Sequence, residues 1–292
     1  MSKELYFYET HLHTAEASAC SNCPGADYVQ KYKETGFAGI FVTDHFFNGN
    51  SGVPRDLPWD QMVDIYCSGY ENAKAAGDKI GLDVFFGLEV NFRGDEYLIY
   101  GPDKAWLKAH PDIMGWSHEK LREEVHKIGG AMIQAHPYRD RGYLEKIRVH
   151  AHHADAFEVH NSGNLPYCDQ YGYQYAKQHG MMMTSGSDIH RVSDLEKNSY
   201  GGVCFTSKIE SSKDYAGRIK SAKGIVPILG NEVVRDNSLA PEIGEGFYGF
   251  ITYADRLIPN PNQEWTKPVC ITNENGEEVD VNPADTIDWS KI

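Results

Sequence analysis

The segment ETHLHT, residues 9–14, places two histidines one residue apart at the end of an apolar, aromatic run. On a β-strand, residues i and i+2 point to the same face, so the rings of His11 and His13 can reach one ion. Imidazole nitrogen is a common ligand of zinc and related metals. Taken alone, the pair is equally compatible with ordinary surface histidines, and the rest of the chain has to decide between the two interpretations.

Ionisable residues recur where other short apolar runs end. They are Asp44, His45, Glu89, His136, Glu158, His160, Asp188 and His190. In a parallel β/α barrel the carboxyl ends of the strands meet at one face, where active sites form. Carboxylates crowded there repel one another and neutral imidazoles cannot offset the charge, so we expect divalent cations. Nitrogen combined with oxygen ligands favours Zn, Mn or Fe over Ca or Mg.

Other potential ligands lie outside this pattern. Cys20 and Cys23 form a CxxC pair without the second pair of a zinc site, so we expect them to be structural or incidental. The HAHH tract at 150–153 resembles a metal-binding tract but does not follow a strand. We interpret the histidines of helices and loops as surface residues: His110, His118, His126, His150, His152, His153 and His179.

The elements that must position the strand-end residues alternate along the chain. Strand-like runs at 4–11, 39–45, 83–90, 96–101, 131–137, 156–161, 181–188, 202–207 and 225–229 are separated by helical patterns at 24–36, 59–81, 117–130, 167–180 and 211–224. This order predicts an α/β fold with a mostly parallel sheet. About seven units suit a TIM-like barrel. We expect residues 1–240 to form this barrel and residues 241–292 to form an irregular C-terminal extension packed on it.

Composition narrows the class of protein. The 292-residue chain is 41% hydrophobic, which is enough for one large core. Its net charge of −14, without a dense Lys/Arg run, argues against a broad nucleic-acid surface. No apolar run approaches the ~20 residues of a membrane span, and the N-terminus lacks signal-peptide features. With scattered cysteines as well, we expect a soluble cytoplasmic protein.

Five short motifs occur in the order typical of the PHP (polymerase and histidinol phosphatase) superfamily. They are HLHT, GIFVTDH, GLE, AHP and GSDIH, and the resemblance covers roughly residues 5–230. It implies a distorted (β/α)7 barrel that binds two or three divalent metal ions and hydrolyses phosphoesters.

Carried over by position, the resemblance assigns ligands to three metals. His11, His13, Glu89 and Asp188 would hold the first, Glu89 would bridge to a second that His136 also binds, and His45 and His190 would hold the third. Two positions depart from the pattern. Leu98 stands where many members supply a further histidine to the second metal. Glu16 is the best candidate for the remaining ligand of the third metal, or else a solvated loop carboxylate.

The resemblance also suggests catalytic and substrate-binding roles. A metal-activated water would attack the phosphorus atom in line with the leaving oxygen, and Asp188 would be essential as a ligand. Asp44 would orient an imidazole, or else accept a backbone amide at its strand end. Arg139 and Arg191 would grip a substrate phosphate, or be surface ion-pair residues. His160, as general acid or polar wall, and Asn161 would line the pocket.

The expected function is hydrolysis of a phosphate ester of a small molecule or nucleotide. Duplex nucleic acid and membranes are not expected partners. Two rival functions stay open. Metal-dependent amidohydrolases also begin with HxH on a barrel strand and cleave C–N bonds. PHP domains attached to bacterial polymerases can lose ligands and serve a structural role.

Overall fold

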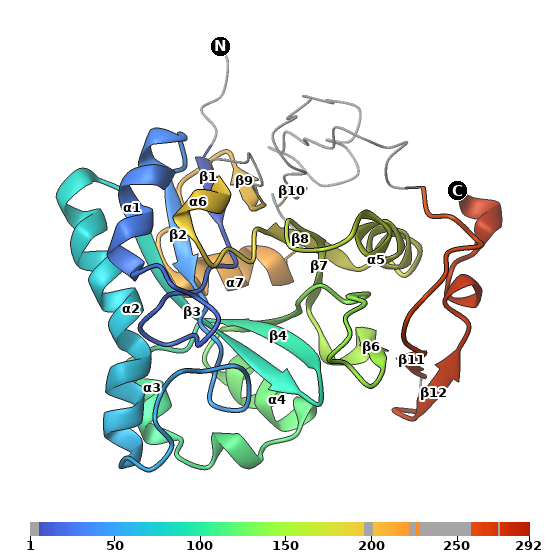
Figure 1. Ribbon diagram of the computed structural model, residues 1–292, viewed down its shortest axis with the longest axis horizontal. Helices are drawn as coiled ribbons and strands as arrows, with labels where there is room; N and C mark the ends of the chain where they lie inside the picture. The colour runs from blue at the N-terminus through green and yellow to red at the C-terminus, as the bar shows by residue number, and fades with distance from the viewer. Residues whose placement is uncertain (1–5, 196–200, 222–225, 228–257, 274) are drawn as a thin grey trace.

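The computed structural model describes residues 6–195, 201–221, 226–227, 258–273 and 275–292, and a single mixed sheet dominates it (Figure 1). The strands of this sheet are β1 (Tyr6–Glu9), β2 (Gly39–Val42), β3 (Asp83–Phe92), β4 (Asp95–Tyr100), β5 (Ala131–Gln134), β7 (Ala156–Asn161), β8 (Met182–Gly186), β9 (Val203–Phe205) and β10 (Val226–Pro227). They run in the order β10-β9-β1-β2-β3-β4-β5-β7-β8.

The two sides of the sheet meet beyond the ends of β1 and β8. Leu12 and Ile189 form a parallel bridge, and the His13 amide donates to the Ile189 carbonyl over 2.9 Å. The sheet is therefore a nearly closed barrel. The predicted TIM-like barrel with a C-terminal extension is confirmed.

Two strands run against the others in the sheet: β9 is antiparallel to β1 and β10, and β4 is reversed as well. β4 is antiparallel to both β3 and β5. It follows β3 through a two-residue hairpin turn in which Arg93 (φ 55°) and Gly94 (φ 104°) both have positive φ. Such turns match the right-handed twist of the flanking strands. Because β4 is reversed, its first residues lie beside the last residues of β3 and β5.

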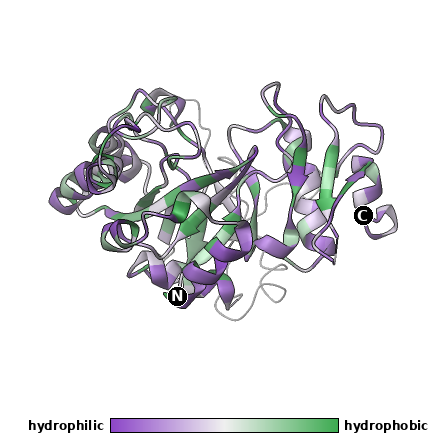
Figure 2. Ribbon diagram, turned by 90° about the horizontal axis from the view of Figure 1, so that it is seen from below, coloured by the Kyte–Doolittle hydropathy of each residue, from purple (hydrophilic) through white to green (hydrophobic). Residues whose placement is uncertain are grey.

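Helices surround the barrel: α1 (Gly25–Glu34), α2 (Trp59–Ile80), α3 (Lys104–Ala109), α4 (His118–Lys127), α5 (Pro166–Gln178), α6 (Val192–Leu195) and α7 (Ser212–Lys220). In Figure 1, α1 and α2 lie side by side on one flank and α5 lies on the other. Hydrophobic residues concentrate on the strands, and hydrophilic residues mark much of the outer helices (Figure 2). The glycine closing the 59–81 pattern caps α2, with Gly81 at φ 73°.

Helix α7 closes the end of the barrel away from the carboxyl ends of β1 and β2. Its Ser212 hydroxyl accepts the Gly101 amide, directly after the last residue of β4. Its buried Tyr215 ring lies 4.8 Å from Phe41 and 4.7 Å from Tyr100, centroid to centroid. This apolar floor leaves the opposite end of the barrel for polar residues.

The chain after residue 257 adds a small second sheet. β11 (Val269–Thr272) pairs with β12 (Glu278–Val281) and, in parallel, with β6 (Ile147–Val149). The Tyr138 hydroxyl donates to Thr286 over 2.7 Å, which ties the terminal segment to the loop after β5. The predicted boundary at residue 240 lies outside the described residues.

This sheet covers part of the HAHH tract. His150 is 2% exposed, and its Nδ1 contacts the Thr272 hydroxyl of β11. Its Nε2 lies 3.6 Å from an Asp95 carboxylate oxygen, which also receives the His118 ring at 2.8 Å. The interpretation of His150 as a surface residue is therefore wrong, because β11 comes from a distant part of the chain.

Candidate metal centre

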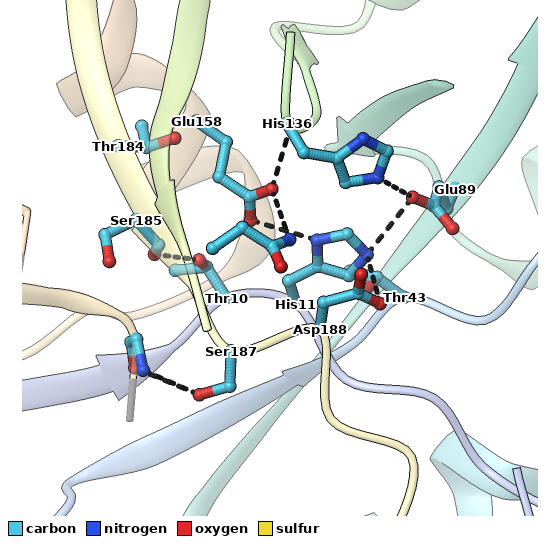
Figure 3. A network of polar contacts seen from close by, with 12 residues as sticks. Thr10, His11, Thr43, Glu89, His136, Glu158, Thr184, Ser185, Ser187 and Asp188 are labelled. Carbon is cyan, nitrogen blue, oxygen red and sulfur yellow. Dashed lines mark hydrogen bonds and ion pairs between the residues drawn. The ribbon is translucent and has the colours of Figure 1, made fainter. Parts of the chain in front are cut away.

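Four histidine rings converge on the buried carboxylate of Glu89. Its Oε1 lies 3.1 Å from His11 Nε2 and 3.3 Å from His136 Nε2. Its Oε2 lies 2.6 Å from His45 Nδ1 and 3.5 Å from His13 Nε2. The close-up shows the His11 and His136 rings pointing at Glu89 (Figure 3). Five of the strand-end residues that the sequence singles out thus meet at one point.

Asp188 completes this side of the cluster. Its Oδ1 lies 3.1 Å from His13 Nε2 and 3.5 Å from His11 Nε2. Its Oδ2 accepts from Arg139 Nη2 over 2.5 Å. Burial opposes ionisation of this carboxyl, but the Arg139 guanidinium and the His11 ring hold its pKa well below the usual range. Asp188 is therefore an anionic group at neutral pH.

Hydrogen bonds behind two of the rings fix which nitrogen faces the cluster. His11 Nδ1 donates to Glu158 Oε1 over 2.9 Å. His13 Nδ1 lies 3.1 Å from the Ser18 hydroxyl, which gives its own proton to Asp44 Oδ1 over 2.6 Å. Ser18 can then only accept from His13. Both rings therefore present Nε2 to the cluster.

The two Nε2 atoms that result lie 3.1 Å apart. Two nitrogen lone pairs at this distance need a proton or a cation between or beside them. Burial lowers the pKa of His11, but Glu158, Asp188 and Glu89 raise it well above its usual value. A divalent cation would take the place of that proton. The donor set, imidazole nitrogen with carboxylate oxygen, fits a transition metal.

Four overlapping groups in the described residues have ligand atoms within 4.8 Å of one another. They are His11–His13–Glu89, His11–His136–Asp188, His45–Glu89–Glu96 and His13–His45–His190. These groups bring together all the metal ligands that the sequence predicts except Glu16. They also add a residue that it did not predict, Glu96.

Glu96 is the second residue of β4 and is 9% exposed. Its Oε1 lies 3.8 Å from His45 Nδ1 and its Oε2 lies 3.5 Å from His136 Nε2. Sequence reasoning searched the carboxyl ends of strands, whereas the reversed β4 places its amino end at this face. The sequence feature that could have revealed Glu96 is an acidic residue near the start of the strand that pairs with β3.

Leu98 stands where the PHP resemblance predicts a further histidine. It lies two residues after Glu96 on β4. It is paired in register with Glu89 and is 1% exposed. It packs among the apolar side chains of the barrel interior, including Phe41 and Ile133. Leu98 therefore belongs to the core, and Glu96 provides the carboxylate at the level of the cluster.

Glu16 lies outside the cluster. Its carboxylate accepts the Gly25 amide at the start of α1 over 3.0 Å, and the Asn72 side chain over 3.0 Å. Glu16 is thus the capping carboxylate of a helix N-terminus, where a negative charge is favourable. The expectation that it ligates the third metal has no support in this placement.

Two ligand candidates have strained backbones. His136 has φ 31° and Asp188 has φ 54°, and among the described non-glycine residues Arg93 is the one other with positive φ. Such strain persists where the surroundings enforce it, and it clusters at functional sites. The loop ends after β5 and β8 are therefore shaped around these two side chains.

Buried carboxylates support the cluster from behind. Asp44 accepts the Thr14 amide over 2.6 Å and the Ser18 hydroxyl, which in turn lies beside His13 Nδ1. Burial raises the pKa of Asp44 to about 6, although these hydrogen bonds lower it. Glu9, which the sequence did not single out, accepts the amides of His11 over 2.8 Å and Ser187 over 2.9 Å. It joins the ends of β1 and β8.

The residues predicted to contact substrate do not all line the cleft above the cluster. Arg139 lies beside Asp188, and Asn161 and Asn164 both accept from its guanidinium over 2.9 Å. Arg191 is exposed and is not among the residues that line the cleft. His160 Nδ1 donates to Asp169 Oδ2 of α5 over 2.8 Å and does not line the cleft either, so this placement does not support a general-acid role.

A cleft of about 460 Å³ opens above the cluster. Its lining includes His45, Glu96, Arg139, Tyr143, Asp188 and His190. A hollow of about 550 Å³ lies elsewhere, against Glu119, Arg122 and His152, and contains none of the cluster residues. The smaller cleft is therefore the candidate site.

Comparison with known proteins identifies solved structures with a similar fold. No family model matches the chain. A solved two-domain protein from Bacteroides vulgatus, described as containing a predicted PHP-like metal-dependent phosphoesterase, superposes with a TM-score of 0.58 at 14% identity, over 78% of this chain and 65% of its own. This likeness confirms the resemblance to PHP proteins at the level of the fold.

Two further likenesses are weaker. The chain is 25% identical over 173 residues to a PolC-type DNA polymerase III of Lacticaseibacillus paracasei; the match spans 53% of this chain and a tenth of the polymerase. An amidohydrolase from Chromobacterium violaceum superposes with a TM-score of 0.44 at 15% identity, over 64% of this chain and 88% of its own. Among the described residues, no helix is long and apolar enough to cross a membrane.

Proposed function

From the PHP-like fold of this chain, we propose that it is a metal-dependent phosphoesterase. Its substrate is a phosphate ester of a small molecule or nucleotide, and its cofactors are two to three divalent ions of Zn, Mn or Fe. The observation that carries the proposal is the buried meeting of four histidines with Glu89, in which two Nε2 atoms lie 3.1 Å apart. A cation bound there would satisfy both nitrogens and offset the charge of the surrounding carboxylates.

The cluster residues would divide among the ions. His11, His13 and Asp188 gather on one side of Glu89, and His136 with Glu96 on another. When bound, the ions would supply an activated water and neutralise charge on the phosphoryl oxygens. They also provide the positive potential that a chain of net charge −14 otherwise lacks for an anionic substrate.

Arg139 would bind the phosphoryl group. Its guanidinium lines the cleft and is held at Nη2 by Asp188 and Asn161, and at Nε by Asn164. A guanidinium fixed in this way loses little freedom on binding an oxyanion and offers a planar set of donors. The cleft volume of about 460 Å³ suits a small molecule or nucleotide.

The test is a turnover screen of the purified protein. Phosphate monoesters, nucleotides and phosphodiesters are assayed after loading with Mn, Zn or Fe, beside a panel of cyclic amides. We expect phosphate release that depends on the metal and disappears in Asp188→Asn. Turnover of amides without any phosphoester would assign the protein to C–N hydrolysis. A metal-loaded protein that hydrolyses neither class would point to a structural module.

A further inference from the structure

The loop that carries Arg139, residues 135–146, is attached to the C-terminal segment, residues 258–273 and 275–292. The loop begins after β5 and ends at β6, which pairs in parallel with β11 of that segment (Figure 1). At this end the Ile147 amide donates to the Pro268 carbonyl over 2.9 Å. A distant part of the chain therefore borders the loop on the side away from the barrel.

The two sequence neighbours of Arg139 both contact the C-terminal segment. Tyr138 is fully buried and donates its hydroxyl to Thr286 over 2.7 Å. The Asp140 carboxylate accepts the Thr266 amide over 2.7 Å and also accepts the Thr266 hydroxyl. The backbone on each side of Arg139 is thus tied to the same segment.

Asp140 depends on these contacts because it is buried. Its exposed fraction is 4%, and the Tyr167 hydroxyl donates a third hydrogen bond to its carboxylate over 3.1 Å. A buried carboxylate needs such bonds to offset the loss of water. Two of these three bonds come from Thr266, so the C-terminal segment fixes where Asp140 sits.

Arg139 itself turns away from the C-terminal segment and into the cleft. Its Nη2 donates to Asn161 over 2.9 Å and to Asp188 over 2.5 Å, and its Nε donates to Asn164 over 2.9 Å. These contacts hold the guanidinium, whereas Asp140 and its partners hold the backbone. An arginine side chain is long and has many rotamers, so both of its ends must be held for the donors to keep one position.

The metal-ligand candidate of this loop is held from the barrel instead. The His136 amide donates to Glu158 Oε2 over 3.1 Å, and Glu158 belongs to β7. Loss of the contacts at Asp140 should therefore move Arg139 and spare the metal ligands. This difference separates a defect in substrate binding from a defect in the metal centre.

We propose that the C-terminal segment is part of the substrate site, because Thr266 holds Asp140 and Asp140 positions Arg139 over the cleft. Asp140 is a positioning residue that acts through the Arg139 guanidinium. The inference rests on the proposed function, in which Arg139 binds the phosphoryl group. Tyr138 supports the same stretch of backbone through Thr286. A segment outside the barrel thereby sets the affinity for the phosphoryl group.

Binding of inorganic phosphate tests this inference without a known substrate. The full chain is loaded with Zn²⁺ or Mn²⁺, freed of excess metal and titrated with phosphate by calorimetry, with metal content measured in parallel. We expect Arg139→Ala to weaken phosphate binding roughly 10–100-fold, as for a lost hydrogen bond between charged groups. Asp140→Ala should weaken it roughly 10-fold, since part of the Arg139 contact survives. Both variants should retain the metal content of the wild type.

The double variant distinguishes positioning from a general structural role. In the Arg139→Ala background, Asp140→Ala should cause no further loss, because its effect runs through the guanidinium. Equal losses in the two backgrounds would overturn the inference. Thr266→Val provides a second test that leaves Asp140 in place, and it should weaken phosphate binding roughly 3-fold because one hydrogen bond is lost. Thr266→Ser keeps the hydroxyl, is the matched control and should bind phosphate as the wild type does.

The remaining outcomes separate this inference from the proposed function. Phosphate binding that is weakened by Arg139→Ala but unchanged in both Asp140→Ala and Thr266→Val would overturn the positioning role alone. If Asp140→Ala does not fold, the comparison of Thr266→Val with Thr266→Ser decides. Metal-loaded wild-type protein that binds no phosphate, or Arg139→Ala that binds it as tightly as the wild type, would remove the phosphoryl-binding role of Arg139 and this inference with it.

Discussion

Two of the four histidines at Glu89 depend on a second residue to aim the ring. Glu158 holds His11 Nδ1 at 2.9 Å, and Ser18, itself bonded to Asp44, holds His13 Nδ1 at 3.1 Å. Such outer partners set the tautomer and the basicity of metal-binding histidines. The chemistry of the centre therefore depends on these supporting residues as well as on the ligands.

Replacement of Ser18 tests that dependence. In Ser18→Ala the His13 Nδ1 proton loses its buried acceptor, so the ring is free to flip or tilt. We expect metal affinity to fall ~10–100-fold, as for other outer partners, with little change in fold. Titration with a competing chelator measures the affinity. Ser51→Ala, which removes a hydroxyl bonded to the Ala17 carbonyl nearby, is the control and should bind metal as the wild type does. Equal affinities in the two variants would contradict the role assigned to Ser18.

Asp188→Asn removes a ligand charge with minimal disturbance of the backbone. Asparagine tolerates positive φ, so the 54° conformation at this position is kept. We expect hydrolysis to fall by more than the ~10–100-fold cost of losing an outer partner, and bound metal to decrease. Circular dichroism should show an unchanged fold. Unaltered turnover would mean that the site has been misassigned.

The direction of β4 decides which of its side chains reaches the centre. Glu96 and Leu98 lie two residues apart on one strand, so they share a face but differ in depth within the barrel. Glu96 meets His45 and His136, whereas Leu98 packs on the apolar core. A reversed strand thus brings its amino end to the functional face.

Substitutions of Glu96 and Leu98 test whether the two side chains lie at different depths in the barrel. Glu96→Gln should leave stability nearly unchanged and reduce metal content, because a carboxylate next to His136 is lost. Leu98→His should cost about 2–4 kcal/mol of unfolding free energy, because it places an imidazole among buried apolar side chains. Urea unfolding and metal analysis of both variants provide the measurement. A gain of bound metal in Leu98→His would show that this position does reach the centre.

The contact between His150 and β11 makes the C-terminal sheet sensitive to acid. Burial lowers the pKa of His150 to about 4 from 6.5, with Asp95 acting in the opposite sense. The folded state thus holds the ring neutral while the unfolded chain protonates it. Its stabilising contribution is full above pH 6.5 and decreases as the pH falls toward 4.

We therefore expect wild-type protein to lose about 2 kcal/mol more than His150→Gln between pH 7 and pH 5. Glutamine does not titrate, so the difference isolates this ring from other acid-sensitive groups. Urea unfolding at the two pH values measures it. His152→Gln, an exposed neighbour, should behave as the wild type. Parallel pH dependence in wild type and His150→Gln would contradict the assignment.

Across the whole molecule, an acidic chain gathers its carboxylates at one end of a barrel. Glu89, Glu96, Glu158 and Asp188 are all buried or nearly so around the histidine cluster. Their repulsion opposes folding unless protons or cations are bound. Metal binding should therefore be linked to stability of the entire barrel, since its ligands come from strands β1 to β8.

Metal removal is the corresponding whole-molecule prediction. Zn²⁺ or Mn²⁺ at a hundredfold excess over its Kd should stabilise the native state by about 2.7 kcal/mol for one site. Thermal unfolding should thus shift to lower temperature after chelation and recover on adding metal back. Asp188→Asn should show a smaller shift. A melting temperature that does not respond to chelation, in protein proven to hold metal, would contradict this linkage.

The sequence by itself determined the barrel, the elements around it and most of the convergent ligands. The ends of strands can be predicted from the sequence because buried runs of apolar residues stop at polar ones. In parallel strands those ends lie at one face of the sheet. His11, His13, His45, Glu89, His136, Asp188 and His190 were identified in this way. The tertiary structure alone decided the remainder, because strand direction and long-range contacts are not local properties. The hairpin at Arg93 and Gly94 reverses β4 and substitutes Glu96 for Leu98. The pairing of Glu16 with α1 removes it from the centre.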